Sequence, residues 1–538
     1  MASPLNDDNV KLEVLRYWQD NLKQSQISQL TGLPKSTIND FITKKSYTKW
    51  WQEYGERPVA AGNMAALHED IDVLGEGVYI FVSAQNNTYV HNKFMDSLEV
   101  LAVERNAQIL CGTFTYNTSG FQNIQKGTDS EEVWYDPRIK KYILDKPVMV
   151  CDDLMWCGEL NILPTAVNPL SGLHSYTRGA SGVVPHAKLQ LESIPTHKSL
   201  PAKIMYTTGA VTKRNYIQKK AGQKAEFHHA FSALIVEVDN EGDFFVRQLN
   251  AETSTGCFYD LDKYYTPSGV YDSNYVEAIN WGDIHVEKMD KVVYDISFGK
   301  NGILDTLRPK YQFIHDVFDA YYRNHHHIKN AHKMFELHIK GKESVRSEVS
   351  AVGEFLQNVN RDYCQSVVVN SNHDRALDRW LNEADYKHDY INSVFFLELQ
   401  LLRYKGIVSG NNIVLLEEAI SKILGYDITD TKFLAIDEQF VVCDQDGNGV
   451  ECGMHGDLGA SGSRGSAMGF ARLSSRVNIG HSHTAKIFDG VYQTGHCMDI
   501  DKVDYAKGPS SWSHSHIITY PNGKRSMITL KNGKWKSS

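Results

Sequence analysis

A run of three β-branched residues, Val367 to Val369, leads directly into the polar stretch Asn370-Ser371-Asn372-His373-Asp374. Such a run predicts a buried strand, and the Asn-Ser pair after it is typical of a turn. An amide oxygen, an imidazole and a carboxylate are therefore placed together at the end of one strand. In open α/β sheets, ligands bind at this edge. Because short polar triplets end many strands, the stretch predicts a site only if similar residues follow other strands.

At 538 residues the chain is too long for one ordinary core, so we expect about two to four domains. The composition, 42% hydrophobic and 22% charged, is that of a soluble globular protein. A net charge of -9 argues against a protein that coats nucleic acid non-specifically. It remains compatible with a nuclease, because a local basic patch and bound cations can supply a positive field.

The eight cysteines are scattered and form no C-x-x-C pair, which indicates a reducing compartment rather than a disulfide framework or a zinc ribbon. The polar N-terminus lacks the apolar core of a signal peptide, and no apolar run approaches the roughly 18 residues that a membrane span needs. We therefore expect a soluble protein of the cytoplasm, without a membrane span.

Residues 1–45 are expected to form a small helical domain. Ile27 and Leu30 mark one short helix, Gly32 a tight turn, and Ile38 with Phe41 a second helix. The pattern resembles the helix-turn-helix of resolvases and repressors, in which the second helix enters the major groove. The exposed residues that would face DNA are Lys35, Ser36, Thr37 and Asn39. The alternative is a helical hairpin used for packing or assembly.

Residues 46–74, interrupted by glycine and proline, are expected to be a linker. Residues 75–275 are expected to form an accessory α/β domain, because strand-like runs such as 78–83 and 107–112 flank a helical pattern at 92–105. This region contains no phosphate loop and no G-x-G-x-x-G. Its densest basic cluster predicts DNA contact through Lys213, Arg214, Lys219 and Lys220, with a solvated charged face as the alternative. We expect residues 75–275 to serve either DNA guidance or oligomerisation.

Metal-type residues follow four further strand-like runs. Asp283 and His285 lie two apart at a strand end and so point the same way. The other runs end at Asp316, at His455 and at the pair His481 and His483.

In order, these stretches read D-x-H, D, N-H-D, H and G-H-x-H, and in this they resemble the calcineurin-like metallophosphoesterase superfamily over residues 276–502. The resemblance implies an α/β fold in which a β-sandwich is flanked by helices. It also implies two divalent metal ions, and mixed nitrogen and oxygen ligands without thiolate suit Mn²⁺ best, with Fe or Zn²⁺ as alternatives.

The resemblance further implies a role for each residue. One metal would be held by Asp283, His285 and His483, the other by Asn372, His455 and His481, with Asp316 as the bridge. His373 would face the scissile phosphate, and Asp374 would hold His373 in position. His315 and Ser371 stand where the family has glycine, and Asp319 is the alternative bridging residue.

The metal site is shared by nucleases and phosphatases, so the flanking regions must indicate the substrate. Arg464, in a glycine-rich run, is expected to contact a nucleic-acid backbone, and residues 503–538 form a basic β-hairpin pattern. With the N-terminal helices, these features favour a DNA nuclease similar in its core to the SbcD-like branch.

The whole chain also resembles early proteins of large tailed siphophages that serve DNA transfer and host DNA degradation. That resemblance implies a homo-oligomer acting in the infected bacterial cytoplasm. The alternatives are a protein or nucleotide phosphatase, and a non-catalytic DNA-binding or assembly protein with a vestigial core.

Overall fold

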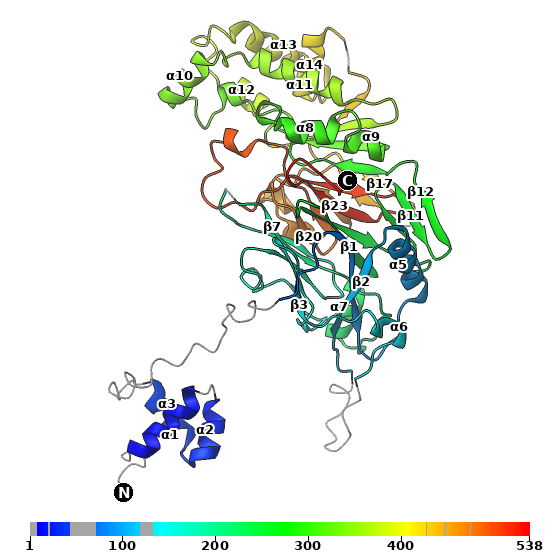
Figure 1. Ribbon diagram of the computed structural model, residues 1–538. Coiled ribbons are helices and arrows are strands. Elements are labelled where there is room, and N and C mark those ends of the chain that lie inside the picture. The colour runs from blue at the N-terminus through cyan, green and yellow to red at the C-terminus, as the bar shows by residue number, and fades with distance from the viewer. Residues whose placement is uncertain are drawn as a thin grey trace. The chain divides into compact units, whose positions relative to one another are not determined.

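The computed structural model describes residues 8–19, 22–43, 71–118, 133–198, 200–426, 428–445, 447, 449–473 and 475–537. The chain divides into two compact units, Met1–Asp72 and Val73–Ser538. Figure 1 labels their helices and strands. Most of the predicted linker, residues 46–70, lies outside the described residues.

The N-terminal unit contains the helices α1 (Asp8–Gln19), α2 (Gln24–Thr31) and α3 (Lys35–Thr43). Gly32 caps the end of α2, and its φ of 68° is a left-handed conformation that glycine adopts without steric cost. The helices bury one small core, which consists of Val14, Leu15, Trp18, Ile27, Leu33, Ile38, Phe41 and Ile42. The predicted helices and turn are therefore present.

In the larger unit, the described strands form four sheets. The four-stranded sheet has the order β2 (Gln108–Phe114), β1 (Gly77–Gln85), β8 (Ser232–Val238) and β9 (Phe244–Asn250). The three-stranded sheet contains β10 (Phe258–Asp260), β11 (Lys263–Thr266) and β12 (Gly269–Asp272). The six-stranded sheet has the order β16 (Thr431–Phe433), β15 (Gln365–Val369), β14 (Tyr311–His315), β13 (Ala278–Asn280), β22 (Ser515–Thr519) and β23 (Arg525–Thr529).

The ten-stranded sheet has the order β17 (Val441–Val442), β18 (Val450–Glu451), β19 (Arg476–Ile479), β21 (Val491–Gln493), β20 (Lys486–Phe488), β6 (Leu191–Ile194), β7 (Lys203–Thr207), β5 (Ser181–Val184), β4 (Leu154–Cys157) and β3 (Pro147–Cys151). The helices of this unit are α5 (Asn92–Glu104), α6 (Pro137–Lys140), α7 (Lys220–His228), α8 (Lys291–Phe298), α9 (Ile303–Leu307), α10 (Ala331–Ile339), α11 (Val345–Val359), α12 (Ala376–Glu383), α13 (Ser393–Ser409), α14 (Leu415–Leu424) and α15 (Ala467–Phe470).

The six-stranded sheet lies between two cores. Strands β13 to β16 are parallel, whereas β22 and β23 form an antiparallel pair beside β13. Side chains alternate along each strand: Ile314 and Val368 pack with α8, α11 and α14, whereas Phe313 and Val367 pack with β17 and β18. The continuous apolar runs of the sequence are explained by this burial on both faces.

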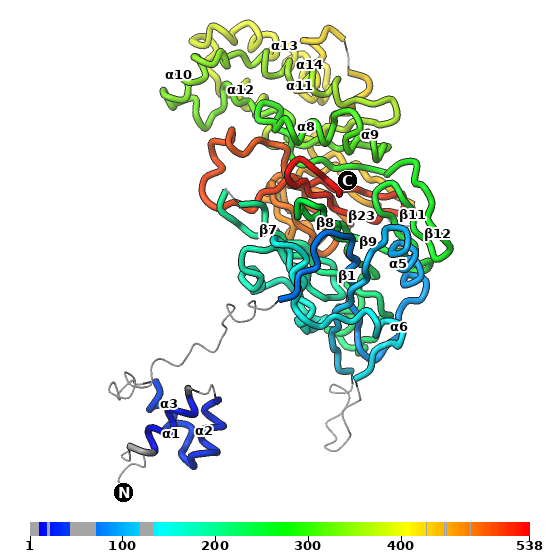
Figure 2. Tube along the Cα trace, viewed as in Figure 1, coloured from blue at the N-terminus to red at the C-terminus, as the bar shows by residue number. Residues whose placement is uncertain are grey.

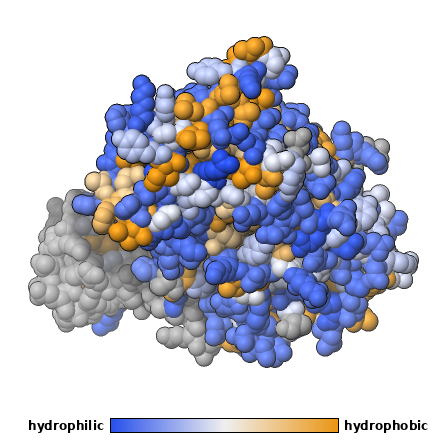
Figure 3. All heavy atoms as spheres, turned by 90° about the horizontal axis from the view of Figure 1, so that it is seen from above, coloured by the Kyte–Doolittle hydropathy of each residue, from blue (hydrophilic) through white to orange (hydrophobic). Residues whose placement is uncertain are grey.

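Figures 1 and 2 show the helices α8 to α14 gathered as one layer at the end of the unit remote from α6. Seen from above, the helical layer carries hydrophobic side chains in a band on its outer surface (Figure 3). Among the described residues, no helix is long and apolar enough to cross a membrane.

The structure is a mixed α/β fold, and its elements agree locally with the sequence. Strands β1 and β2 and helix α5 lie where the patterns predict them, and the predicted C-terminal hairpin is β22–β23. The ten-stranded sheet joins strands from both sides of residue 275, because β20 pairs with β6. The domain boundary predicted between residues 275 and 276 stays a prediction, and both sides of it belong to one compact unit.

The C-terminal hairpin also links distant parts of the chain. The backbone N–H of Gln248 in β9 donates to Ser526 Oγ in β23 at 3.1 Å, and Figure 2 shows this C-terminal segment beside β9. Nearby, Arg247 is fully buried and binds Glu237 at 2.9 Å and Asp260 at 2.7 Å. This ion cluster joins strands β8, β9 and β10.

Candidate metal centre

The polar residues that follow the parallel strands meet at one edge of the two large sheets. Asp283 follows β13, Asp316 follows β14 and Asn372 follows β15. On the facing sheet, His455 follows β18, and the pair His481 and His483 follows the parallel strand β19. The carboxyl ends of parallel strands share an edge, so residues almost 200 positions apart in the sequence converge.

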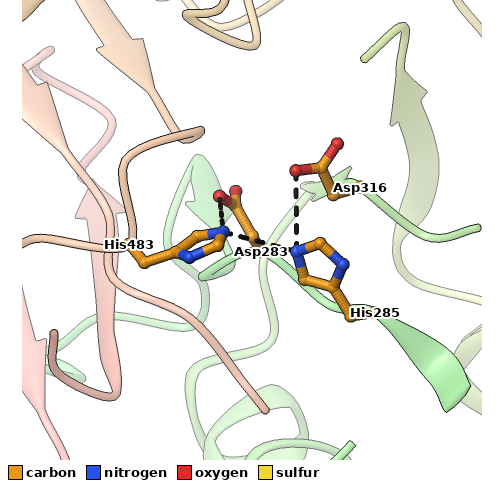
Figure 4. Close-up of side chains that lie close together, drawn as sticks. All are labelled: Asp283, His285, Asp316 and His483. Carbon is orange, nitrogen blue, oxygen red and sulfur yellow. Dashed lines mark hydrogen bonds and ion pairs between the residues drawn. The ribbon is translucent and has the colours of Figure 1, made fainter. Parts of the chain in front are cut away.

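One group of four side chains lies close enough to hold a cation: Asp283, His285, Asp316 and His483 (Figure 4). His285 Nε2 lies 3.4 Å from His483 Nε2 and 3.6 Å from Asp316 Oδ2. His483 Nε2 lies 3.2 Å from Asp283 Oδ2. All four side chains are buried, and their nitrogen and oxygen atoms point to a common centre.

A second group adjoins the first through Asp316. His455 Nε2 lies 3.2 Å from Asp316 Oδ2 and 3.1 Å from Asn372 Oδ1. His481 Nδ1 also lies 3.1 Å from Asn372 Oδ1. The seven residues predicted as metal ligands are thus brought together in two adjoining groups, with Asp316 in contact with both.

The electrostatics of this centre require positive charge. Asp283 and Asp316 are completely buried, and none of their carboxylate oxygens has a hydrogen-bond partner. Burial raises the pKa of Asp316, but the nearby imidazoles of His455 and His373 outweigh it and hold the pKa well below its usual range. Buried carboxylates are normally paired or bound to metal. The surrounding donors are carboxylate oxygens and imidazole nitrogens, and a mixed set of this kind fits a divalent transition-metal ion.

The backbone is strained at the same place. His285, Asp316, His481 and His483 have φ values of 50°, 48°, 73° and 59°, a region that residues with side chains seldom adopt. Such outliers cluster at functional sites because the surrounding structure fixes them there. At Gly480, an added Cβ would lie 2.2 Å from Asp283 Oδ1, so the close approach of the two strand ends requires glycine.

His373 lies beside the two groups, and Asp319 orients it. His373 Nδ1 lies 2.8 Å from Asp319 Oδ1, and the same oxygen lies 2.8 Å from His285 Nδ1. Lys288 Nζ donates to the other oxygen of Asp319 at 2.8 Å. Burial lowers the pKa of His373, but the carboxylates of Asp316 and Asp319 raise it to about 9 overall.

The expectation that Asp374 holds His373 is therefore wrong. Asp374 Oδ1 accepts a hydrogen bond from the backbone N–H of Phe318 at 2.9 Å, and the Asp374 N–H donates to Ser371 Oγ at 3.1 Å. A residue directly after His373 lies on the turn that leads into α12, so its side chain is directed at the loop after β14. Asp374 fixes that loop instead.

The sequence alone did not reveal two neighbours of the centre. The sequence predicts Asp319 only as an alternative bridge, although its spacing of three from Asp316 places a second carboxylate on the same loop. Lys288 had no signal in the sequence, because a lone lysine is usually a surface residue. His315, which stands at the family's glycine position, is completely buried and packs beside His455 with ring centroids 5.6 Å apart.

Most of the residues predicted to bind DNA are exposed on the surface of their own unit. In the N-terminal unit, Lys35, Ser36 and Asn39 are exposed on α3, and Thr37 is half-buried. In the larger unit, the exposed residues are Lys213, Arg214, Lys219, Lys220 and Arg464.

Of this second set, Arg214 lines a cleft of about 1050 Å³ that also contains Arg476, Lys524 and Arg525. Burial lowers the pKa of Lys524, and the neighbouring guanidinium groups lower it further. Arg525 is buried and donates to the carbonyl oxygens of Val477 and Gly490. Crowded cations of this kind favour an anionic ligand.

Comparison with known proteins gives one informative match. Protein A1 of Escherichia phage T5 is 40% identical over 491 residues, which cover 89% of this chain and 86% of that protein. No protein-family model and no solved structure matches the chain.

Proposed function

This chain belongs to the family of Protein A1 of Escherichia phage T5, and we propose that it is a phage-encoded, metal-dependent nuclease that hydrolyses the phosphodiester bonds of DNA. In this proposal the core is of the metallophosphoesterase type and uses two divalent ions, most suitably Mn²⁺.

Asp316 carries the proposal. Its Oδ2 atom lies 3.6 Å from His285 Nε2 and 3.2 Å from His455 Nε2, so one carboxylate contacts both groups of donors. A shared carboxylate is what a pair of neighbouring cations needs, because it compensates the repulsion between them. When bound, two such ions polarise a phosphodiester and acidify a water molecule into a nucleophile.

The chain's own residues supply the remaining chemistry. His373 is half-buried, with 23% of its side chain accessible, and so can reach a phosphate beside the metal centre. Asp319 accepts a hydrogen bond from His373 Nδ1, which leaves Nε2 to donate to the phosphate or to the leaving oxygen. Asp319 also fixes His285 through its Nδ1, so one carboxylate orients both imidazoles.

Two features support DNA as the substrate. The exposed polar residues of α3 follow the turn at Gly32, an arrangement in which a second helix contacts the major groove. The cleft that Arg214, Arg476 and Lys524 line has more cationic than carboxylate side chains, although Asp444, Glu451 and Asp489 also line it. It can therefore accept a phosphate backbone, and it extends to Met454, the residue before His455. The site of action in this proposal is the infected bacterial cytoplasm.

The test is a hydrolysis assay on the purified full-length chain. Duplex DNA, single-stranded DNA, RNA and a simple phosphomonoester are each incubated with Mn²⁺, with Mg²⁺ and with chelator. We expect Mn²⁺-dependent cleavage of DNA that the chelator abolishes and that Asp316→Asn removes. Asp385→Asn, a surface change 66% exposed, is the matched control and should remain active. Inert DNA with every divalent ion contradicts the nuclease, and cleavage of the phosphomonoester alone indicates a phosphatase.

A further inference from the structure

Helix α13 carries apolar side chains on its exposed face as well as on its buried face, which is unusual for a helix at the surface. Its inner face packs through Phe395, Phe396 and Leu399, and Phe396 stacks on Tyr386 with ring centroids 4.8 Å apart. A helix that is hydrophobic all round is normally buried all round. The outer face of α13 is nevertheless exposed, and it contributes to the hydrophobic band of Figure 3.

The exposed side chains form a continuous stripe with a seven-residue repeat. They are Val394, Leu397, Leu401, Tyr404 and Val408, and their exposed fractions run from 50% for Leu397 to 88% for Val408. The spacing of three, four, three and four residues is the a/d pattern of a coiled coil. A repeat of this kind keeps one seam facing a partner helix along its full length.

We propose that α13 is a homodimerisation helix, and that its outer stripe packs against the same stripe of a second copy of this chain. A two-fold interface requires one patch that is complementary to itself. A heptad stripe meets this requirement, because each side chain can insert between four side chains of an identical stripe.

Leu401 is the middle residue of the stripe, so a two-fold axis that pairs two stripes in antiparallel orientation passes near it. Glu398, beside the stripe, is held within its own chain, because it binds Arg346 at 3.2 Å and Lys422 at 3.8 Å. The contact between the two copies therefore depends on the apolar side chains.

The exposed apolar area is sufficient for a stable dimer. Tyr390, Ile391 and Ile407 adjoin the stripe, and each is more than half exposed. Together, these eight side chains offer on the order of 800 Å² per chain, which is about what each partner contributes to a standard interface. Monomeric proteins seldom expose an apolar patch of this size.

The first test is the molar mass of the full-length chain in solution, measured by light scattering and by sedimentation over a range of concentrations. The wild-type chain should be a dimer or a multiple of one. Leu401→Lys should halve the mass, or raise the dissociation constant of the dimer at least tenfold. The matched control is Val103→Lys, a change at an 84% exposed valine on α5 outside the stripe, and it should leave the mass unchanged.

The second test fixes the geometry. Leu401→Cys places a thiol near the proposed axis, and the native cysteines are buried or half-buried. Mild oxidation should therefore link two chains through position 401, whereas Val103→Cys should not give this product.

Several outcomes would overturn the proposal. A wild-type chain that is monomeric in solution contradicts the proposal, and this includes a monomer in which the N-terminal unit of the same chain covers the stripe. An oligomer whose mass is unaffected by Leu401→Lys contradicts it as well. Circular dichroism of each variant distinguishes lost dimerisation from lost folding, and a folded Leu401→Lys variant that remains dimeric contradicts the interface.

Discussion

Asp319 and His373 illustrate how single side chains determine the properties of this centre. Asp319 is buried and accepts from His285, His373 and Lys288 at once, so it couples a proposed ligand to a proposed catalytic group. In contrast, the Asp374 carboxylate accepts from the backbone N–H of Phe318, and the Asp374 N–H donates to Ser371 Oγ. Both side chains reach the loop after β14, but His373 binds the carboxylate of Asp319 whereas Asp374 binds the backbone of Phe318, and this separates their functions.

His373→Ala should lower the rate of DNA hydrolysis by about 100-fold or more, the usual cost of losing a positioned proton donor. Metal content should be unchanged, because in the proposal His373 is not a ligand. The measurements are initial rates under Mn²⁺ saturation and metal analysis of the same sample. His388→Ala, which removes an imidazole 78% exposed on the surface, is the control. Wild-type rates for His373→Ala would exclude the assigned role.

At the scale of elements, buried charge connects strands that the sequence leaves separate. Arg247 in β9 lies diagonally across from Glu237 in β8 and also binds Asp260 in β10. Burial raises the pKa of Glu237, but Arg247 outweighs it and lowers the pKa to about 2. Removing one member of such a cluster leaves an uncompensated buried charge, at a cost of roughly 3–5 kcal/mol.

The pH dependence of this cluster follows from the sign of the shift. Because the pKa of Glu237 is lower in the folded protein, its stabilisation is present above the ordinary pKa of 4.5 and is lost as the pH falls towards about 2. Glu237→Gln should therefore be less stable than the wild type at pH 7, and the difference should shrink as the pH falls below about 4.5. Urea unfolding of both proteins at pH 7, 5, 4 and 3 measures this difference in the free energy of unfolding.

The control for this prediction is Glu241→Gln, on the turn between β8 and β9. Glu241 is 67% exposed and pairs with Lys534, so its loss should change stability by about 0.5 kcal/mol or less at every pH. A difference between Glu237→Gln and wild type that does not change with pH would contradict the assignment of the ion pair.

At the scale of the whole molecule, the candidate centre joins the two large sheets. Asp283, Asp316 and Asn372 come from one sheet, whereas His455 and His483 come from the other. Cations held between them would connect the sheets, so metal binding and global stability should be linked.

Metal removal should therefore destabilise the wild-type chain. A ligand at about 100 times its dissociation constant adds about 2.7 kcal/mol per site, which corresponds to several degrees in Tm. We expect Mn²⁺ to raise Tm and chelator to reverse the change, as followed by calorimetry. Asp316→Asn should largely abolish this response and lower the metal content. If Asp319→Asn abolishes it while Asp316→Asn does not, then Asp319 is the bridge.

Much of this organisation could be predicted from local patterns. Apolar runs, turn residues and the polar residues that follow strands lie within a few positions of one another, so β13, β14, β15 and the residues after them are evident in the sequence. The same holds for the three N-terminal helices and for the C-terminal hairpin. Each of these predictions depends on backbone periodicity, which a short stretch of sequence determines.

The sequence by itself determined which residue types stand at the strand ends, and therefore the chemistry of the centre. Only the tertiary structure decided that Asp319 orients His373, that β6 and β20 join two regions in one sheet, and that the apolar stripe of α13 faces outward. The physical reason is that orientation, sheet pairing and exposure depend on contacts between residues far apart in the chain, which no local pattern encodes.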